Sequence, residues 1–183
     1  PAFKNYNGFP NTLCISINEE VVHGIPSNRK LEVGQIVSID CGVVVNEYYG
    51  DYAYSFALGE MSDKKLELLN VTKESLSKGI SAALTKNRNG DIGFAIQTYV
   101  ESFGFSVVRE LIGHGVGKNL HEHPEVPNYG KRRKGIKLEK NMLICIEPMI
   151  NMGKKEIVQA NDGWTIKTLD GMPSAHYEHM VIV

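Results

Sequence analysis

The stretch IVSIDCGVVVNEYYGDYAYSFAL, residues 36–58, decides the fold of this chain. Its first ten residues, Ile36–Val45, are mostly apolar and β-branched, and apolar residues resume at Tyr48 after the polar step Asn46-Glu47. This pattern predicts a hairpin of two antiparallel strands. Asp40 stands inside the first strand, where an unpaired carboxylate is costly. Asp40 therefore needs a partner.

The turn of this hairpin sets which residues face each other. With a two-residue turn, Gly42 lies opposite Asp51, so Asp51 is a diagonal neighbour of Asp40 on the same face of the sheet. Two carboxylates this close repel each other unless a cation lies between them. A turn with an odd number of residues would change the pairing, so the prediction depends on the turn length.

Two further acids stand in apolar segments. Glu147 follows LICI and precedes Pro148, which indicates a strand end, an edge or a bulge, and Glu178 precedes HMVIV. Any one acid of this kind has a plain alternative, which is pairing with Lys or Arg or an edge position that faces water. For the four acids together we favour bound cations over that alternative.

A histidine between glycines is the remaining candidate ligand. His114 lies in GHGVG, where the glycines let the backbone come close and leave the imidazole free to point at a cation, and His121 follows seven residues later. For either histidine alone, a hydrogen-bonded place in the core is the alternative. Four carboxylates and one imidazole without a thiolate suit Mn, Fe(II), Co or a two-ion site better than a structural zinc site.

A short internal repeat relates two segments of the chain. LEVGQIVSID from Leu31 and LEKNMLICIE from Leu138 both open with Leu-Glu and enter an apolar strand, and Asp40 then matches Glu147. Strands that open with Leu-Glu are common, which leaves a chance match as the alternative. If the repeat is real, it predicts two similar halves that each present an acid toward a shared centre.

Two helices are predicted after the hairpin. Ser62 can cap the first, which ends before Asn87. The apolar residues of the second recur at the spacing of an amphipathic helix, with Asn89 as its cap and Gly104 as its stop. Further strands are expected over residues 106–110, 142–150, 164–168 and 176–183, with a loop over residues 113–135. Strand hairpins separated by helices favour an α+β fold over alternating βαβ units.

Composition narrows the class of protein. The chain has 183 residues, with 20 Lys or Arg, 21 Asp or Glu and a formal net charge of -1, which gives no reason to expect specific nucleic-acid binding or an anionic membrane surface as partner. Three cysteines without a CxxC pair favour a reducing compartment. No apolar run approaches the roughly 20 residues that span a bilayer, and no signal peptide is visible. We therefore expect one cytoplasmic domain.

Six motifs identify the chain as similar to a known family. They are VHGIP, SIDCGV, YGD, GHGVG, IEPM and YEH, and with the order of the acids and His114 they resemble type I methionine aminopeptidases over about residues 8–183. The resemblance implies an α+β fold of the pseudo-symmetric pita-bread type, with an antiparallel sheet core and helices on the outside. It also implies a single catalytic metallopeptidase domain, residues 1–183, whose pseudo-repeated halves cover about 1–105 and 106–183.

The resemblance further implies a dinuclear aminopeptidase that removes the initiator methionine from nascent chains with a small second residue. Two divalent ions are expected, with Co, Mn or Fe(II) favoured and Zn also compatible. Asp40 resembles the acid that binds mainly one of the two ions, and Asp51 and Glu178 resemble the pair of acids that bridge the two ions. His114 and Glu147 resemble ligands of the other ion, and Glu147 also has the position of the proton shuttle.

The same resemblance assigns residues that contact substrate. His23 resembles the histidine near the scissile bond, and His121 resembles the one that stabilises the tetrahedral intermediate. Phe9, Cys14 and Trp164 occupy positions that line the methionine pocket. Polarizable aromatic and sulfur walls suit a flexible thioether side chain.

Several positions depart from the family pattern. Many members have HGDTS where this chain has YGDYA, so Tyr52 and Ala53 replace small hydroxyl residues, which puts the metal preference and the water network in question. HEEP becomes HEHP with His123, and Leu120 stands where an aromatic residue is frequent. The family also has a segment before Phe3 and another strand after the last residue here, so we expect a domain truncated at both ends.

Two other functions remain open on the sequence. A proline-specific peptidase of the aminopeptidase P or prolidase type uses similar ligands, and a pita-bread protein that has lost catalysis would bind partners instead. Against the last stands the complete set of five ligands. We expect a monomer that acts on the N-terminal methionine of nascent polypeptides. Lys131–Lys134 offers a contact to the ribosome, although we favour a solvated loop tip, because four charges in a glycine-rich loop need no partner.

Overall fold

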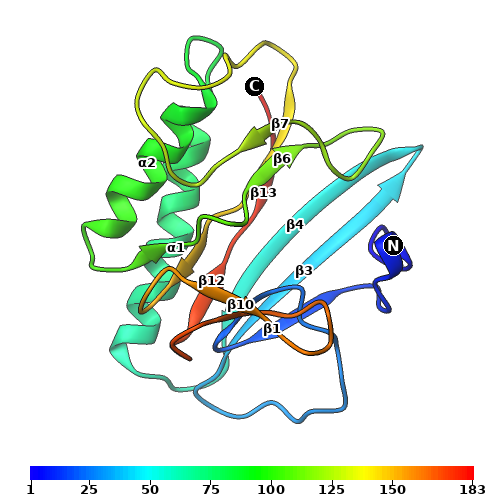
Figure 1. The fold of residues 1–183 in the computed structure, drawn as a ribbon, viewed down its shortest axis with the longest axis vertical. Helices are drawn as coiled ribbons and strands as arrows, with labels where there is room; N and C mark the ends of the chain where they lie inside the picture. The colour runs from blue at the N-terminus through cyan, green and yellow to red at the C-terminus, as the bar shows by residue number, and fades with distance from the viewer.

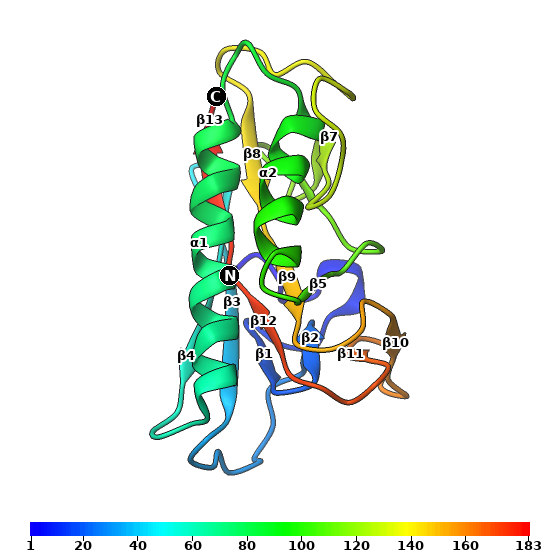
Figure 2. The same ribbon diagram turned by 90° about the vertical axis from the view of Figure 1, so that its left-hand side faces the viewer.

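Two helices cover one side of a set of small antiparallel sheets in a computed structural model that describes all 183 residues (Figure 1). Turned by 90°, the same view shows the two helices side by side on that face (Figure 2). The helices are α1 (Asp63–Ala82) and α2 (Asn89–Glu101), and a 3-10 turn covers Tyr6–Gly8. The predicted α+β class with helices on the outside is confirmed. No helix combines the length and the hydropathy that a membrane crossing requires.

Thirteen strands form four sheets, and every pairing is antiparallel. The sheet orders are β1-β3-β4, β10-β11-β2, β12-β9-β5 and β13-β8-β6-β7. The strands are β1 (Cys14–Ile17), β2 (Glu20–Val22), β3 (Ile36–Val45), β4 (Tyr48–Ala57), β5 (Ser106–Val107), β6 (Gly113–Gly115), β7 (Glu122–Val126), β8 (Leu143–Ile146), β9 (Met149–Asn151), β10 (Ile157–Gln159), β11 (Ile166–Thr168), β12 (Ser174–His176) and β13 (His179–Ile182).

The hairpin of β3 and β4 has the predicted register. Val45 pairs with Tyr48 across the two-residue turn, and Gly42 pairs with Asp51. Both turn residues have positive φ, 51° at Asn46 and 68° at the glutamate after it, as a type I′ turn requires. Asp40 and Asp51 therefore share one face of this sheet.

The main core lies between the helices and the sheets behind them. Ile92, Ile96 and Val100 occur at helical spacing on α2, and none of their surface is exposed. They belong to one cluster with Leu68 of α1 and Ile146 of β8. This core joins the helices to the strands that lead toward the candidate ligands.

The start of α2 differs from the prediction by one residue. Arg88 is the N-cap, and Asn89 is the first helical residue. The Asn89 side chain instead accepts a hydrogen bond from the Ile136 N–H and donates one to the Glu125 carbonyl, both at 2.9 Å. Because these contacts use the amide to anchor the loop beside the helix, it does not cap the helix.

Both late strand regions are broken; Pro148 indicated an interruption of the first, whereas no signal indicated an interruption of the second. Residues 142–150 form β8 and β9 on either side of Glu147 and Pro148, and residues 176–183 form β12 and β13 on either side of Tyr177 and Glu178. Since β8 pairs with β13 and β9 with β12, the breaks lie opposite each other. Proline has no N–H for a ladder.

The expected loop over residues 113–135 is also wrong, because it contains β6 and β7. These short strands are rich in glycine, histidine and proline, which masked the strand pattern. Gly115 pairs with Glu122 in β7 and with Ile144 in β8, and a Cβ at Gly115 would lie 2.1 Å from the His123 carbonyl oxygen. Only glycine allows strands to approach this closely. The short strands β1, β2 and β10 were not predicted either.

The two repeat segments share the same local structure. The N–H groups of Gln35 and Met142 each donate to the carbonyl three residues earlier, at 3.3 and 3.2 Å. The preceding residues, Gly34 and Asn141, both have positive φ, 86° and 70°. Each turn leads into a strand with a later antiparallel partner, β4 for β3 and β13 for β8. The match therefore extends from sequence to backbone.

Candidate metal centre and substrate cavity

One cavity of about 270 Å³ collects every residue that the sequence singled out as ligand, catalyst or pocket wall. These ten residues come from strands and loops that are far apart along the chain, so the fold brings them together. They are Phe9, Cys14, His23, Asp40, Asp51, His114, His121, Glu147, Trp164 and Glu178.

Two of the acids reach the cavity from the β3–β4 hairpin. Asp51 is 8% exposed, and one of its oxygens accepts the Tyr52 N–H at 3.1 Å. Asp40 pairs across the sheet with Cys14 on one side and Ala53 on the other. Its Oδ1 atom is buried and has no hydrogen-bond partner. A buried carboxylate oxygen without a donor is costly unless a cation contacts it.

The other two acids reach the cavity from the strand breaks. Glu178 is 2% exposed, and its Oε1 atom is also buried without a partner. Its backbone N–H donates to the Ala53 carbonyl of β4 at 2.9 Å. Asn128 donates from Nδ2 to the Glu147 carbonyl at 3.0 Å. These backbone contacts outside the local ladders hold the two glutamates toward the centre.

His114 is held by its own strand with one ring nitrogen free. Its Nδ1 atom lies 2.9 Å from the Gly115 carbonyl oxygen, a contact that requires a proton on Nδ1. The other nitrogen, Nε2, is then an acceptor and lies 3.4 Å from Glu147 Oε1. Burial lowers the pKa of His114 to about 4, so the ring is neutral at pH 7. A neutral imidazole with a free Nε2 is the form that binds metal ions.

The four carboxyl groups are crowded in a cavity that no Lys or Arg lines. Burial raises the pKa of Asp51 to about 6. Burial, followed by the charge of Glu178, raises the pKa of Asp40 well above its usual value. The pKa values of Glu147 and Glu178 are raised for the same reasons, burial first and neighbouring carboxylates second. A divalent cation would offset this repulsion, and the donor set therefore fits one.

A thiol lies among the candidate ligands that the sequence reasoning described as free of thiolate. Ligand atoms of Cys145, Asp51, His114 and Glu178 all lie within 4.8 Å of one another. Burial and the nearby carboxylates raise the pKa of Cys145, so it is a neutral thiol. The signal was its position two residues before Glu147 in a segment predicted to be a strand, because alternate residues of a strand share a face.

His176 is a second residue that sequence reasoning missed. It is 2% exposed, lines the cavity, and its Nε2 atom is buried without a hydrogen-bond partner, 3.9 Å from Glu147 Oε2. Burial lowers the pKa of His176 to about 3, so this ring is neutral. Its position two residues before Glu178 was the available signal.

The remaining candidates form the substrate side of the cavity. Phe9 and Trp164 meet edge to face with ring centroids 5.2 Å apart, and Cys14 packs in the same apolar cluster as Phe9. His121 Nδ1 lies 2.7 Å from the Tyr6 hydroxyl, and its ring centroid is 4.3 Å from that of His114. Burial lowers the pKa of His121. This side therefore combines an apolar wall with a neutral imidazole.

The departures at positions 52 and 53 fall on opposite faces of β4. Tyr52 is 46% exposed, and its ring lies edge to face with the His179 ring on the side away from Asp51. Ala53 is buried opposite Asp40, where its methyl group replaces a hydroxyl. Only Ala53 therefore changes the surroundings of the acids directly.

The chain is similar to proteins of known name along its whole length. A family model described as metallopeptidase family M24 matches residues 3–183. The methionine aminopeptidase of Clostridium acetobutylicum is 51% identical over 184 residues, which cover 100% of this chain and 74% of that protein. Methionine aminopeptidase 1 of Bacillus subtilis is 49% identical over 183 residues with the same coverage.

Solved structures give the same result. The crystal structure of methionine aminopeptidase from Rickettsia prowazekii has a TM-score of 0.98 at 41% identity and covers 100% of this chain and 74% of that chain. A prolidase from Pyrococcus horikoshii has a TM-score of 0.74 at 20% identity and covers 94% of this chain and 45% of that chain. The second likeness is one of fold alone.

Proposed function

The chain belongs to metallopeptidase family M24, and from that premise we propose that it acts as a methionine aminopeptidase on peptides with a small second residue. The pita-bread fold expected from the sequence is confirmed by the structural relatives. One observation carries the proposal for the site. Four crowded carboxyl groups, of which Asp51 and Glu178 are buried and the other two half-buried, share a single cavity with an apolar wall of Phe9 and Trp164.

We propose that this cavity holds two divalent ions, with Mn, Fe(II) or Co favoured and Zn also compatible. Asp40 would bind mainly one ion, Asp51 and Glu178 would bridge, and His114 and Glu147 would bind the other. The unpartnered oxygens of Asp40 and Glu178 and the free Nε2 of His114 support this assignment. Bound ions of this kind supply Lewis acidity and make water acidic enough to act as a nucleophile at neutral pH.

The protein groups around the ions would orient the substrate and move protons. His121, a neutral ring whose Nδ1 contacts the Tyr6 hydroxyl, would donate from Nε2 to the carbonyl oxygen as charge develops on it. His23 would contact the peptide near the scissile bond. Glu147, with its raised pKa, would take a proton at one carboxylate oxygen and pass it to the leaving amine.

The proposed pocket wall supports a preference for methionine. Phe9 and Trp164 present ring surfaces beside the buried Cys14, and all three border the same cavity as the acids. A thioether gains favourable contacts with aromatic rings and sulfur. The limited cavity volume of about 270 Å³ leaves little room for a large second side chain.

Two alternatives make different predictions for this cavity. The proline-specific peptidase remains an alternative because it shares the fold, although its structural relatives are only about 20% identical. A binding protein without catalysis would tolerate loss of ligands, whereas all five candidates are present here and converge on one cavity.

The cellular location, oligomeric state, domain organisation and partners of the enzyme are also proposals. We propose a cytoplasmic monomer built as one catalytic domain, residues 1–183, with the shared turns before β3 and β8 supporting two pseudo-repeated halves that divide near residue 105. Its partners would be the N-terminal methionines of nascent polypeptides. A contact of Lys131–Lys134 with the ribosome is supported only by four adjacent charges in an exposed loop.

Hydrolysis of three peptides tests the proposed function. Metal-loaded protein should cleave Met-Ala-Ser, should hardly cleave Met-Lys-Ser, and should leave Ala-Pro intact. After exhaustive chelation, checked by elemental analysis, activity should vanish, and Mn, Fe(II) or Co should restore it. Cleavage of Ala-Pro without cleavage of Met-Ala-Ser would select the prolidase function, and full activity without metal would refute the dinuclear site.

A further inference from the structure

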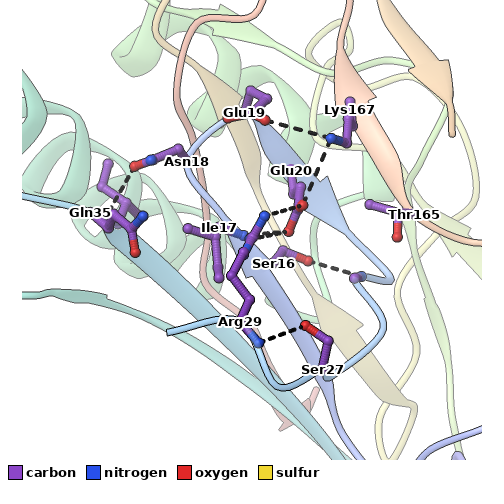
Figure 3. A network of polar contacts seen from close by, with 12 residues as sticks. Ser16, Ile17, Asn18, Glu19, Glu20, Ser27, Arg29, Gln35, Thr165 and Lys167 are labelled. Carbon is purple, nitrogen blue, oxygen red and sulfur yellow. Dashed lines mark hydrogen bonds and ion pairs between the residues drawn. The ribbon is translucent and has the colours of Figure 1, made fainter. Parts of the chain in front are cut away.

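The two ends of the segment that carries His23 meet at the carboxylate of Glu20, which does not line the cavity. Figure 3 shows the contacts of Glu20. The side chain of Glu20, in β2, is 11% exposed, and Arg29 contacts both of its oxygens, from Nη1 to Oε1 at 3.3 Å and from Nη2 to Oε2 at 3.2 Å. The Ile17 N–H donates to Oε2 at 2.9 Å. Both ends of the segment 20–29 are thereby fixed to one carboxylate, since bidentate pairs restrict geometry as well as distance.

Lys167 ties the same carboxylate to β11. Its Nζ atom lies 3.8 Å from Glu20 Oε1 and 3.5 Å from Glu19 Oε1. Figure 3 shows Glu20 between the Lys167 ammonium and the Arg29 guanidinium. The three residues Glu20, Arg29 and Lys167 are named the ionic clamp.

The strands joined by the clamp end at the cavity. β2 and β11 are antiparallel, with Val22 paired to Ile166. His23 directly follows β2, and Trp164 stands two residues before β11, so both lie at the same end of this strand pair. Both line the cavity. The relative position of the histidine and the pocket wall is therefore set by how β2 lies on β11.

The backbone at His23 is constrained on both sides. Its φ of 58° lies in the left-handed region, which is costly for a residue other than glycine and needs support from its surroundings. The next residue, Gly24, donates its N–H to the Ser16 hydroxyl at 3.1 Å and accepts the Ile15 N–H at 2.8 Å. A Cβ at Gly24 would lie 2.2 Å from the Ile15 carbonyl oxygen. The clamp and β1 together hold His23 in this conformation.

We propose that the ionic clamp is a positioning device that sets His23 against Trp164, so that the scissile bond and the methionine side chain are aligned at the same time. This inference rests on the proposed function, because it uses the roles given to those two residues. No clamp residue lines the cavity, and none is a candidate metal ligand. The clamp should therefore affect substrate alignment and leave metal binding unchanged.

A purely structural role makes a different prediction. A partly buried ion pair that only stabilises the fold would lower the unfolding temperature and leave the kinetic constants of the folded enzyme unchanged. Misalignment of a catalytic group costs rate even when the fold persists, by up to about 10²-fold for a shift on the order of 1 Å. Kinetics of the folded variants therefore separate the two roles.

The test compares Arg29→Gln, Arg29→Lys and Lys167→Gln with Glu67→Gln, which removes an exposed ion pair to Lys64 on α1. The metal-loaded proteins are assayed for kcat and KM on Met-Ala-Ser and for metal affinity by calorimetry. Trp164 is the single tryptophan, so emission reports its surroundings directly. Arg29→Gln should lower kcat/KM about tenfold and shift the emission, with wild-type metal affinity, and Arg29→Lys should recover part of the loss.

The outcomes are distinct for the clamp and for the proposed function. Wild-type kcat/KM and emission in Arg29→Gln, equal to those of Glu67→Gln, would overturn the clamp. Loss of metal affinity together with activity would overturn it as well, because the effect would not be confined to the substrate side. If Arg29→Gln fails to fold, Lys167→Gln decides, since that side chain is about one-third exposed. Failure of the proposed function would appear already in the wild type, while the emission comparison would still test the clamp.

Discussion

The two pairs of acids in the cavity are held in different ways. Asp40 and Asp51 lie inside β3 and β4, which pair without interruption over all ten residues of each strand. Glu147 and Glu178 lie at breaks, where neither residue belongs to a strand. The first pair is placed by the register of one hairpin, and the second pair is placed by contacts between distant segments.

This difference indicates which of the two regions positions the other, the β3–β4 hairpin (the continuous half) or the segments around the breaks at Glu147 and Glu178 (the broken half). Inside a ladder, backbone groups are committed to the neighbouring strand. At the break, the Glu178 N–H is released from its own ladder and donates to the Ala53 carbonyl of the continuous hairpin at 2.9 Å. The hydroxyl of Ser55 in β4 also accepts the His176 N–H at 2.9 Å and donates to the carbonyl of the same residue at 2.8 Å. The broken half is therefore docked on the continuous half.

The largest expected effect in this comparison concerns two histidines, His114 and His121, that lie beside the broken half. His114, whose Nε2 faces Glu147, should act as a ligand, so His114→Ala should lose metal and activity, and excess metal should restore part of the activity. His121 should act on charge that develops in the transition state, so His121→Ala should keep its metals and lose about 10²–10³ in kcat. Calorimetric metal titration and kcat at saturating metal measure both. Metal loss in His121→Ala with unchanged affinity in His114→Ala would mean that the two roles are reversed.

A smaller effect concerns His176, which stands at the break of β12. Burial lowers its pKa to about 3 in the folded chain, against about 6.5 when unfolded. A histidine with a lowered folded pKa stabilises the protein fully above the unfolded value, and that contribution is lost as the pH falls toward the folded value. The metal-free wild type should therefore lose about 1.4 kcal/mol relative to His176→Gln between pH 7.5 and pH 5.5.

Denaturant unfolding of both proteins, in the presence of chelator at several pH values, measures this difference. Glutamine keeps an amide that can donate toward Glu147 and does not titrate, so other groups cancel in the comparison. A constant difference across this pH range would show that His176 is not held neutral at the break.

The hairpin and its two acids could be predicted from sequence because the information is local. Asn46 and the glutamate after it define a two-residue turn, and counting from that turn places Asp51 beside Asp40 without knowledge of the rest of the fold. The apolar spacing of α2 is local in the same sense. Its capping residue was missed because the Asn89 side chain is used by segments about 36 and 47 residues away.

The broken half could not be predicted in the same way. The acids at positions 147 and 178 were recognised, and Pro148 indicated the first break, but the second break is supported by a contact of the Glu178 N–H with the Ala53 carbonyl, 125 residues earlier in the chain. Cys145 and His176 were missed because each was read as part of a continuous apolar strand, although each stands two residues before an acid. In a strand, alternate residues share a face, so this spacing would have placed Cys145 on the same face as Glu147 and His176 on the same face as Glu178.

A metal titration tests the central claim most directly, which is that acids from the continuous and broken halves bind the same two ions. Calorimetry with Mn or Co on metal-free wild type, Asp51→Asn and the surface control Glu67→Gln gives the number of ions per chain and their affinities. We predict two ions for the wild type and the control, and weaker binding of both ions in Asp51→Asn because a bridging ligand serves each. A wild type that binds no divalent ion, or Asp51→Asn with two ions at unchanged affinity, would contradict the account.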